Sequence, residues 1–154
     1  MKKTLFHFVA ILLGAGALLT SCFGSIDDDW TPVDPPKMLK QQWMTTDSRA
    51  GSHALNFFDL GTFDGCICAF WCESQEAFDE YRSTAVISMS PEIIYKYTCF
   101  KKGSQYSIVF VNEFNVDLVY YVSDLKKNTM NLELSDGVVL KMTRVDPPVK
   151  VERE

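Results

Sequence analysis

Four cysteines, Cys66, Cys68, Cys72 and Cys99, are the residues whose spacing could support covalent or metal chemistry. The first three follow a C-x-C-x3-C pattern, which is not a usual zinc-binding spacing, so we expect no metal. On a continuous strand their side chains share one face, and residues two apart lie about 6–7 Å from each other, which is too far for a bond. Cys99 is then the expected partner of one of the three. We predict a Cys72–Cys99 disulfide, with the other pairings and free buried thiols as alternatives.

His53 is the next candidate for chemistry, because the other histidine, His7, lies in an apolar N-terminal stretch. The sequence contains no G-x-S-x-G, H-E-x-x-H, phosphate-loop or dinucleotide pattern that would give His53 a catalytic partner. The adjacent carboxylates Asp79 and Glu80 are typical of a solvated helix face. We therefore expect a protein that is not an enzyme and that uses no cofactor.

The N-terminus has the features of an export signal. Lys2 and Lys3 precede an apolar stretch over 5–19, which at about 15 residues is short for a permanent transmembrane helix. The following residues, Leu19-Thr20-Ser21-Cys22, resemble the lipobox of bacterial lipoproteins. The resemblance implies a signal peptide over 1–21, diacylglycerol on the Cys22 thiol, and acylation of the new amine by a fatty acid such as palmitate. Two or three acyl chains hold a protein firmly on a membrane.

An acidic, proline-rich segment over 22–37 follows and is predicted to be an extended tether. Phe23 stands where an inner-membrane retention signal would place Asp, which favours the outer membrane. The triplet at 27–29 resembles the acidic surface-export signals of some lipoproteins, with a solvated spacer as the alternative. Loss of Lys2 and Lys3 with the signal changes the net charge from −5 to about −7, so nucleic acid is not an expected partner.

The rest of the chain alternates between apolar and polar residues, as β-strands do. One short helix is predicted over 75–82, with Ser74 as its N-cap. Many short strands with regular turn residues indicate an antiparallel barrel or sandwich over 38–145, followed by a charged tail over 146–154. The predicted strands are 39–46, 53–60, 65–72, 84–90, 93–100, 105–112, 116–123, 129–135 and 138–145.

The turn of the last hairpin can be predicted from its register. A two-residue turn at 136–137 would place Lys141 opposite Leu132 and bury the lysine. A three-residue loop over 135–137, with Gly137 at positive φ, brings the two apolar faces together. The resulting pairs are Leu134–Val138, Leu132–Leu140 and Met130–Met142.

Trp43 in the first long strand and Arg144 near the end of the last resemble a residue pair of the lipocalin family. The family's glycine two residues before the Trp is Gln41 here. Residues 38–145 as a whole resemble the lipocalin-like domains of small Gram-negative lipoproteins. It implies a small up-and-down barrel of about eight strands, closed at one end by Trp43 and Arg144.

Two functions are compatible with such a barrel. In the first, its interior binds a small apolar ligand through aromatic residues. In the second, the same residues fill the core, and the protein docks on another envelope protein through a strand edge or the segment 73–83. The candidate ligand-lining residues are Phe57, Phe70, Tyr95, Tyr97, Tyr106, Phe110 and Tyr120.

Overall fold

The structure is a computed structural model that describes residues 28–51, 53–84 and 86–154. The chain divides into two compact units, Met1–Thr31 and Pro32–Glu154. The predicted signal peptide and Cys22 lie outside the described residues. The second unit extends beyond the predicted domain, 38–145, at both ends. The prediction of an extended tether over 22–37 is therefore wrong for its last residues, because the Val33 N–H donates to the Cys99 carbonyl at 2.9 Å and Val33 packs against the barrel core.

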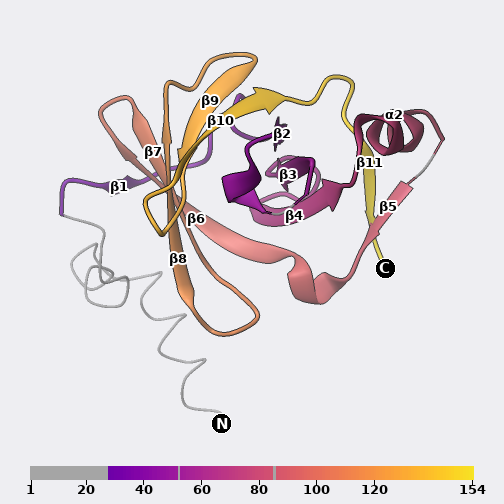
Figure 1. The fold of residues 1–154 in the computed structure, drawn as a ribbon. Helices are drawn as coiled ribbons and strands as arrows, with labels where there is room; N and C mark the ends of the chain where they lie inside the picture. The colour runs from indigo at the N-terminus through magenta and orange to yellow at the C-terminus, as the bar shows by residue number, and fades with distance from the viewer. Residues whose placement is uncertain (1–27, 52, 85) are drawn as a thin grey trace, which may run out of the picture. The chain divides into compact units, whose positions relative to one another are not determined.

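Eight antiparallel strands form a closed barrel within the second unit (Figure 1). Each strand pairs with its neighbour along the chain, and β10 pairs back with β2 to close the ring. The predicted all-β, lipocalin-like fold is therefore confirmed. The barrel strands are β2 (Gln42–Thr45), β3 (Leu55–Asp59), β4 (Cys66–Cys72), β6 (Tyr95–Lys102), β7 (Gln105–Val111), β8 (Asp117–Ser123), β9 (Thr129–Glu133) and β10 (Val139–Arg144). The short elements β1 (Thr31–Pro32), η1 (Ser48–Ala50) and η2 (Pro91–Ile93) complete this part of the chain.

The last hairpin has the predicted register. Leu132 pairs with Leu140 and Met130 with Met142, and all four side chains are at most 2% exposed. The Leu134 N–H donates to the Val138 carbonyl at 2.9 Å, which closes the three-residue loop. Gly137 has φ 83°, a conformation that side chains with a Cβ rarely adopt. Burial of the apolar faces of both strands therefore favours the three-residue loop over a two-residue turn.

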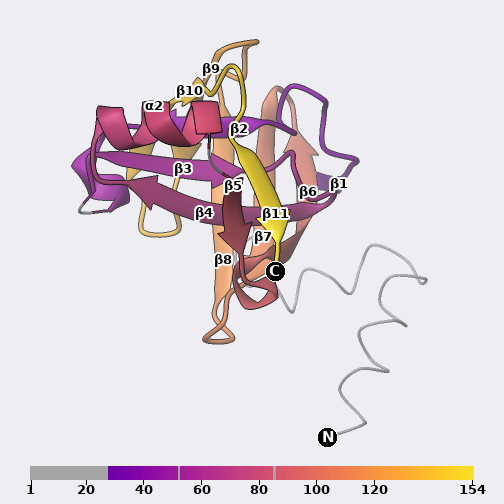
Figure 2. The same ribbon diagram turned by 90° about the vertical axis from the view of Figure 1, so that its right-hand side faces the viewer.

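A second hydrophobic core lies against the outer face of β3 and β4. It is covered by α2 (Gln75–Thr84), β5 (Val86–Met89) and β11 (Lys150–Arg153), which lie on the same side of these strands (Figure 2). Helix α2 matches the prediction, and the Ala77 N–H donates to the Ser74 hydroxyl at 3.1 Å as expected of an N-cap. The shared buried residues are Leu55, Phe57, Cys66, Cys68, Phe70, Cys72, Phe78, Met89, Ile94, Val145, Val149 and Val151.

Two predictions about this region are wrong. The segment predicted as a charged tail, 146–154, contains β11, which pairs in parallel with β5. The predicted strand over 84–90 is β5, which belongs to this two-stranded sheet and not to the barrel. Val149 and Val151 alternate with charged residues, so one face of the segment is buried while the charges stay in water.

A buried polar network attaches the C-terminal segment to the barrel. The Gln42 amide donates to the Val149 carbonyl and accepts from the Val149 N–H, both at 2.8 Å. It also donates to the Asp59 carboxylate at 2.9 Å. Asp59, only 1% exposed, accepts the N–H groups of Gly61 and Thr62 as well, each at 2.9 Å. Each of these donors has an acceptor inside the protein. Removal of one partner would leave the others without hydrogen bonds, so the network stabilises the fold only when it is complete.

The predicted Cys72–Cys99 disulfide is absent from the structure. All four cysteines of the described residues are free thiols, with Cys99 in the barrel core and Cys72 in the second core. Cys72 lies on β4 and Cys99 on β6, and the two side chains belong to different cores, so they do not pair. Burial raises the pKa of the Cys68 thiol to about 12 and that of Cys99 to about 11, so both are protonated at neutral pH.

We expect the mature chain, residues 22–154 with Cys22→Ser, to react slowly with Ellman's reagent at pH 7.5 while folded. The reason is that the thiolate is the reactive form and these four side chains are buried. In 8 M urea under non-reducing conditions, thiol counting should give four groups per chain. A count of two would show that a disulfide forms after all.

Candidate ligand-binding site

The barrel is open at the end where β4 and β6 separate. These strands pair only at Cys66–Lys96 and Ile67–Tyr95, so the remainder of β4 pairs with β3 alone within the described residues. A pocket of about 310 Å³ opens beside this gap. Its volume is at the lower end of the range of small-molecule sites, about 300–1,000 Å³. The residues that line it are Phe58, Ile67, Cys68, Ala69, Ile93, Tyr95, Phe110, Asn112, Glu113, Leu118 and Tyr120.

Aromatic rings form much of the pocket wall. Phe110 meets Tyr120 edge to face, with ring centroids 5.1 Å apart, and stacks with Tyr95 at 5.9 Å. Phe58 meets Tyr120 edge to face at 6.2 Å. These are favourable aromatic arrangements, so the wall is held in place without a ligand.

The opposite end of the barrel is filled. Trp43 is fully buried there, where β2 meets the last residue of β10. A barrel of about eight strands is only just wide enough for side chains to fill it.

The β7–β8 loop forms the rim of the pocket and is closed by hydrogen bonds of its own. The Asn112 side-chain oxygen accepts the N–H groups of Phe114 and Val116, each at 3.0 Å. Asn115 adopts φ 57°, which Asn tolerates better than most residues. The Phe114 side chain projects from this loop and is 75% exposed.

Glu113 and Tyr95 form a polar contact at the rim. The Tyr95 hydroxyl donates to the Glu113 carboxylate. Burial, together with this hydrogen bond, raises the pKa of Tyr95 to about 12, and the same bond lowers the pKa of Glu113. At neutral pH the tyrosine is therefore neutral and the glutamate charged.

Some of the predicted ligand-lining residues meet in this pocket and others do not. Tyr95, Phe110 and Tyr120 line it. Phe57 and Phe70 lie in the second core, where their rings stack 4.7 Å apart.

Tyr97 and Tyr106 pack against the barrel core away from the pocket. Phe58 also faces the interior but is not among the predicted ligand-lining residues. Its position directly opposite Trp43 on the neighbouring strand is the signal that could have identified it.

Trp43 and Arg144 are directly opposite each other on β2 and β10 at the filled end. The Trp43 indole N–H donates to the Leu39 carbonyl at 3.1 Å, and the Arg144 guanidinium pairs with the Asp146 carboxylate. Gly61 provides the close packing beside this pair: a Cβ there would lie 2.7 Å from the Lys40 carbonyl oxygen. The Gln41 side-chain oxygen, by contrast, is buried and has no hydrogen-bond partner within the described residues.

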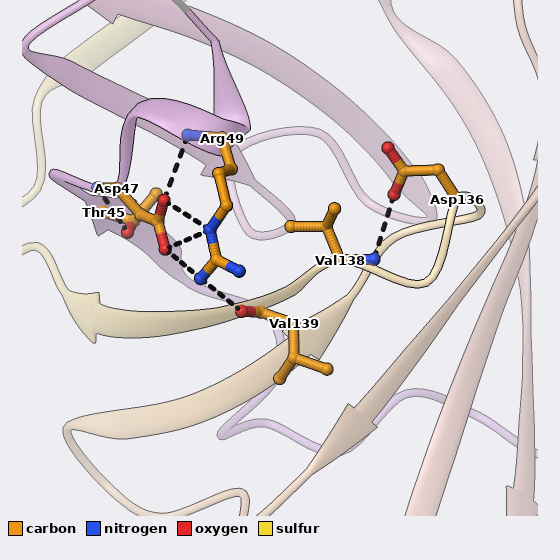
Figure 3. A network of polar contacts seen from close by, with 6 residues as sticks. All are labelled: Thr45, Asp47, Arg49, Asp136, Val138 and Val139. Atoms are coloured by element: carbon orange, nitrogen blue, oxygen red, sulfur yellow. Dashed lines mark hydrogen bonds and ion pairs between the residues drawn. The ribbon is translucent and has the colours of Figure 1, made fainter.

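A larger hollow of about 530 Å³ is bordered by Thr45, Asp47, Arg49 and Val139. An Arg49 terminal nitrogen lies 2.6 Å from the Asp47 carboxylate and donates to the Val139 carbonyl at 3.3 Å, so Arg49 and Asp47 pair with each other (Figure 3). The Arg49 side chain lowers the pKa of Asp47 to about 2. This network links the β2–β3 connection to β10, so we assign it a structural role.

The fold and the pocket define a small lipocalin-like barrel whose interior is filled at one end and hollow at the other. Comparisons with protein-family models, curated proteins and solved structures found no match. Within the described residues, no helix has the length and apolar character needed to cross a membrane. The same part of the chain contains no group of three or more His, Cys, Asp or Glu residues arranged to hold a metal ion.

Proposed function

We propose that this protein is a lipoprotein of the outer membrane whose barrel binds a small apolar ligand without catalysing a reaction. The observation that carries the ligand part is the pocket at the open end, with its wall of aromatic and aliphatic side chains and few polar groups. Pockets of this composition are the usual sites of small-molecule binding.

The anchor part of the proposal depends on the lipobox-like residues 19–22 and on the tether that follows them. Acyl chains on Cys22 would hold the barrel near a membrane, and the acidic chain itself would add little attraction to anionic lipid. A ligand carrier placed there would meet apolar molecules that partition into the membrane.

The pocket volume limits the size of the ligand. At about 30 Å³ for each water-sized group, 310 Å³ has room for on the order of ten such groups. This suits a molecule with one short chain or a small ring system better than a lipid with two long chains.

Ala69 offers a direct test of the pocket, because its side chain lines the pocket and is exposed to it. We expect the mature chain to bind the neutral dye N-phenyl-1-naphthylamine, with increased fluorescence. Ala69→Phe should weaken this binding by about tenfold or more, since the added ring occupies ligand space. Fluorescence titration measures both values.

Ala54→Phe is the matched control, since Ala54 is exposed and does not line the pocket. It should bind the dye as the parent does. Failure of the folded parent protein to bind, with a cooperative thermal transition intact, would contradict the proposed ligand site.

A further inference from the structure

The pocket has one charged group. Among the residues that line it, Glu113 alone carries a charge, and it lies at the rim beside the aromatic wall. Its carboxylate accepts one hydrogen bond from Tyr95, and no salt bridge to it is found within the described part of the chain. A carboxylate has about four lone-pair positions, so Glu113 can accept further donors or a cation from a ligand.

The aromatic rings around Glu113 favour the same kind of partner. Tyr95, Phe110 and Tyr120 all line the pocket that Glu113 borders. The face of an aromatic ring attracts cations, and quaternary ammonium groups are bound in proteins by such rings. A carboxylate beside aromatic rings is therefore suited to a cation that carries apolar substituents.

The same arrangement disfavours anionic ligands. A fatty-acid carboxylate at the rim would lie near the Glu113 charge, and like charges repel each other. The hydrogen bond from Tyr95 lowers the pKa of Glu113, which keeps this negative charge in place at neutral pH.

We propose that the pocket selects ligands with an apolar chain and a positively charged, alkylated ammonium head over ligands with the same chain and a carboxylate head. This specificity rests on the proposed function of the pocket as a ligand site. Glu113 is the residue that discriminates between the heads, and the aromatic wall accepts the chain.

Competition against N-phenyl-1-naphthylamine at pH 7.5 tests this selectivity, using decyltrimethylammonium and decanoate below their micelle concentrations. We expect the ammonium ligand to displace the dye at about tenfold lower concentration than decanoate. Glu113→Gln should reduce this ratio to near one while dye binding itself persists. Glu133→Gln makes the same charge change at an exposed position outside the pocket and should leave the ratio unchanged.

The outcomes separate this inference from the proposed function. If the parent protein binds the dye but shows no preference for the ammonium head, or keeps its preference in Glu113→Gln, the selectivity is wrong and the apolar site remains. If neither the dye nor either decyl compound binds, the proposed site itself is wrong. An equal loss of preference in Glu133→Gln would attribute the effect to net charge and overturn the role of Glu113.

Discussion

We expect Cys22→Ser to abolish incorporation of labelled palmitate into the protein. The thiol of Cys22 is the atom that would carry diacylglycerol, and a serine hydroxyl does not replace it in the lipobox reaction that the sequence resembles. Without lipid on this residue, cleavage before it and acylation of the new amine should also stop. Metabolic labelling and mass spectrometry of the N-terminal peptide measure these losses.

Ser21→Ala is the matched control, because a small residue at this position is compatible with a lipobox. It should be labelled and cleaved as the parent is. Labelling of the Cys22→Ser protein would contradict the proposed anchor. An unlabelled parent protein cut at another position would indicate an ordinary secretory signal.

The second large effect concerns the stability of the barrel. Asp59→Ala should lower the free energy of unfolding by about 3–5 kcal/mol, because it removes a buried carboxylate that accepts several hydrogen bonds, each worth about 1–3 kcal/mol. The donors are the N–H groups of Gly61 and Thr62 and the amide of Gln42. For a domain with a total stability of about 5–15 kcal/mol this is a large fraction. Urea denaturation of the mature chain should show a lower midpoint with an unchanged slope.

Asp64→Ala is the control for this change. Asp64 pairs with Lys40 at 2.7 Å, but its side chain is 88% exposed, and such surface pairs contribute little to stability. The same substitution five residues along the chain should therefore leave the midpoint nearly unchanged. Equal losses in the two variants would mean that the buried network does not stabilise the fold.

Local patterns were sufficient to predict most of the strands and one turn in detail. In the last hairpin, apolar and polar residues alternate over 129–135 and 140–143, so a single register buries the apolar faces of both strands and leaves Lys141 exposed. Helix α2 was predictable for a similar reason, because Ser74 supplies a local cap that needs no tertiary partner.

The same patterns were insufficient for β3 and β4, because both faces of these strands carry apolar residues. Phe57 and Phe58 are adjacent, and nothing in the local sequence states which one enters the barrel. Closure of the barrel pairs Trp43 with Phe58, which directs Phe57 outward to the second core. The sequence alone therefore does not reveal that Phe57 and Phe70 lie in the second core and not in the ligand pocket.

The sequence by itself determined the all-β class, the alternation that defines each strand and the turn that ends the last hairpin, because these depend on neighbours within a few residues. Only the tertiary structure decided which faces point inward, that the C-terminal segment forms β11, and that the barrel is hollow at one end. It also brought Glu113 to Tyr95, which lies 18 residues earlier in the chain. These features depend on how distant strands meet when the barrel closes, and the local alternation is compatible with either face being inside.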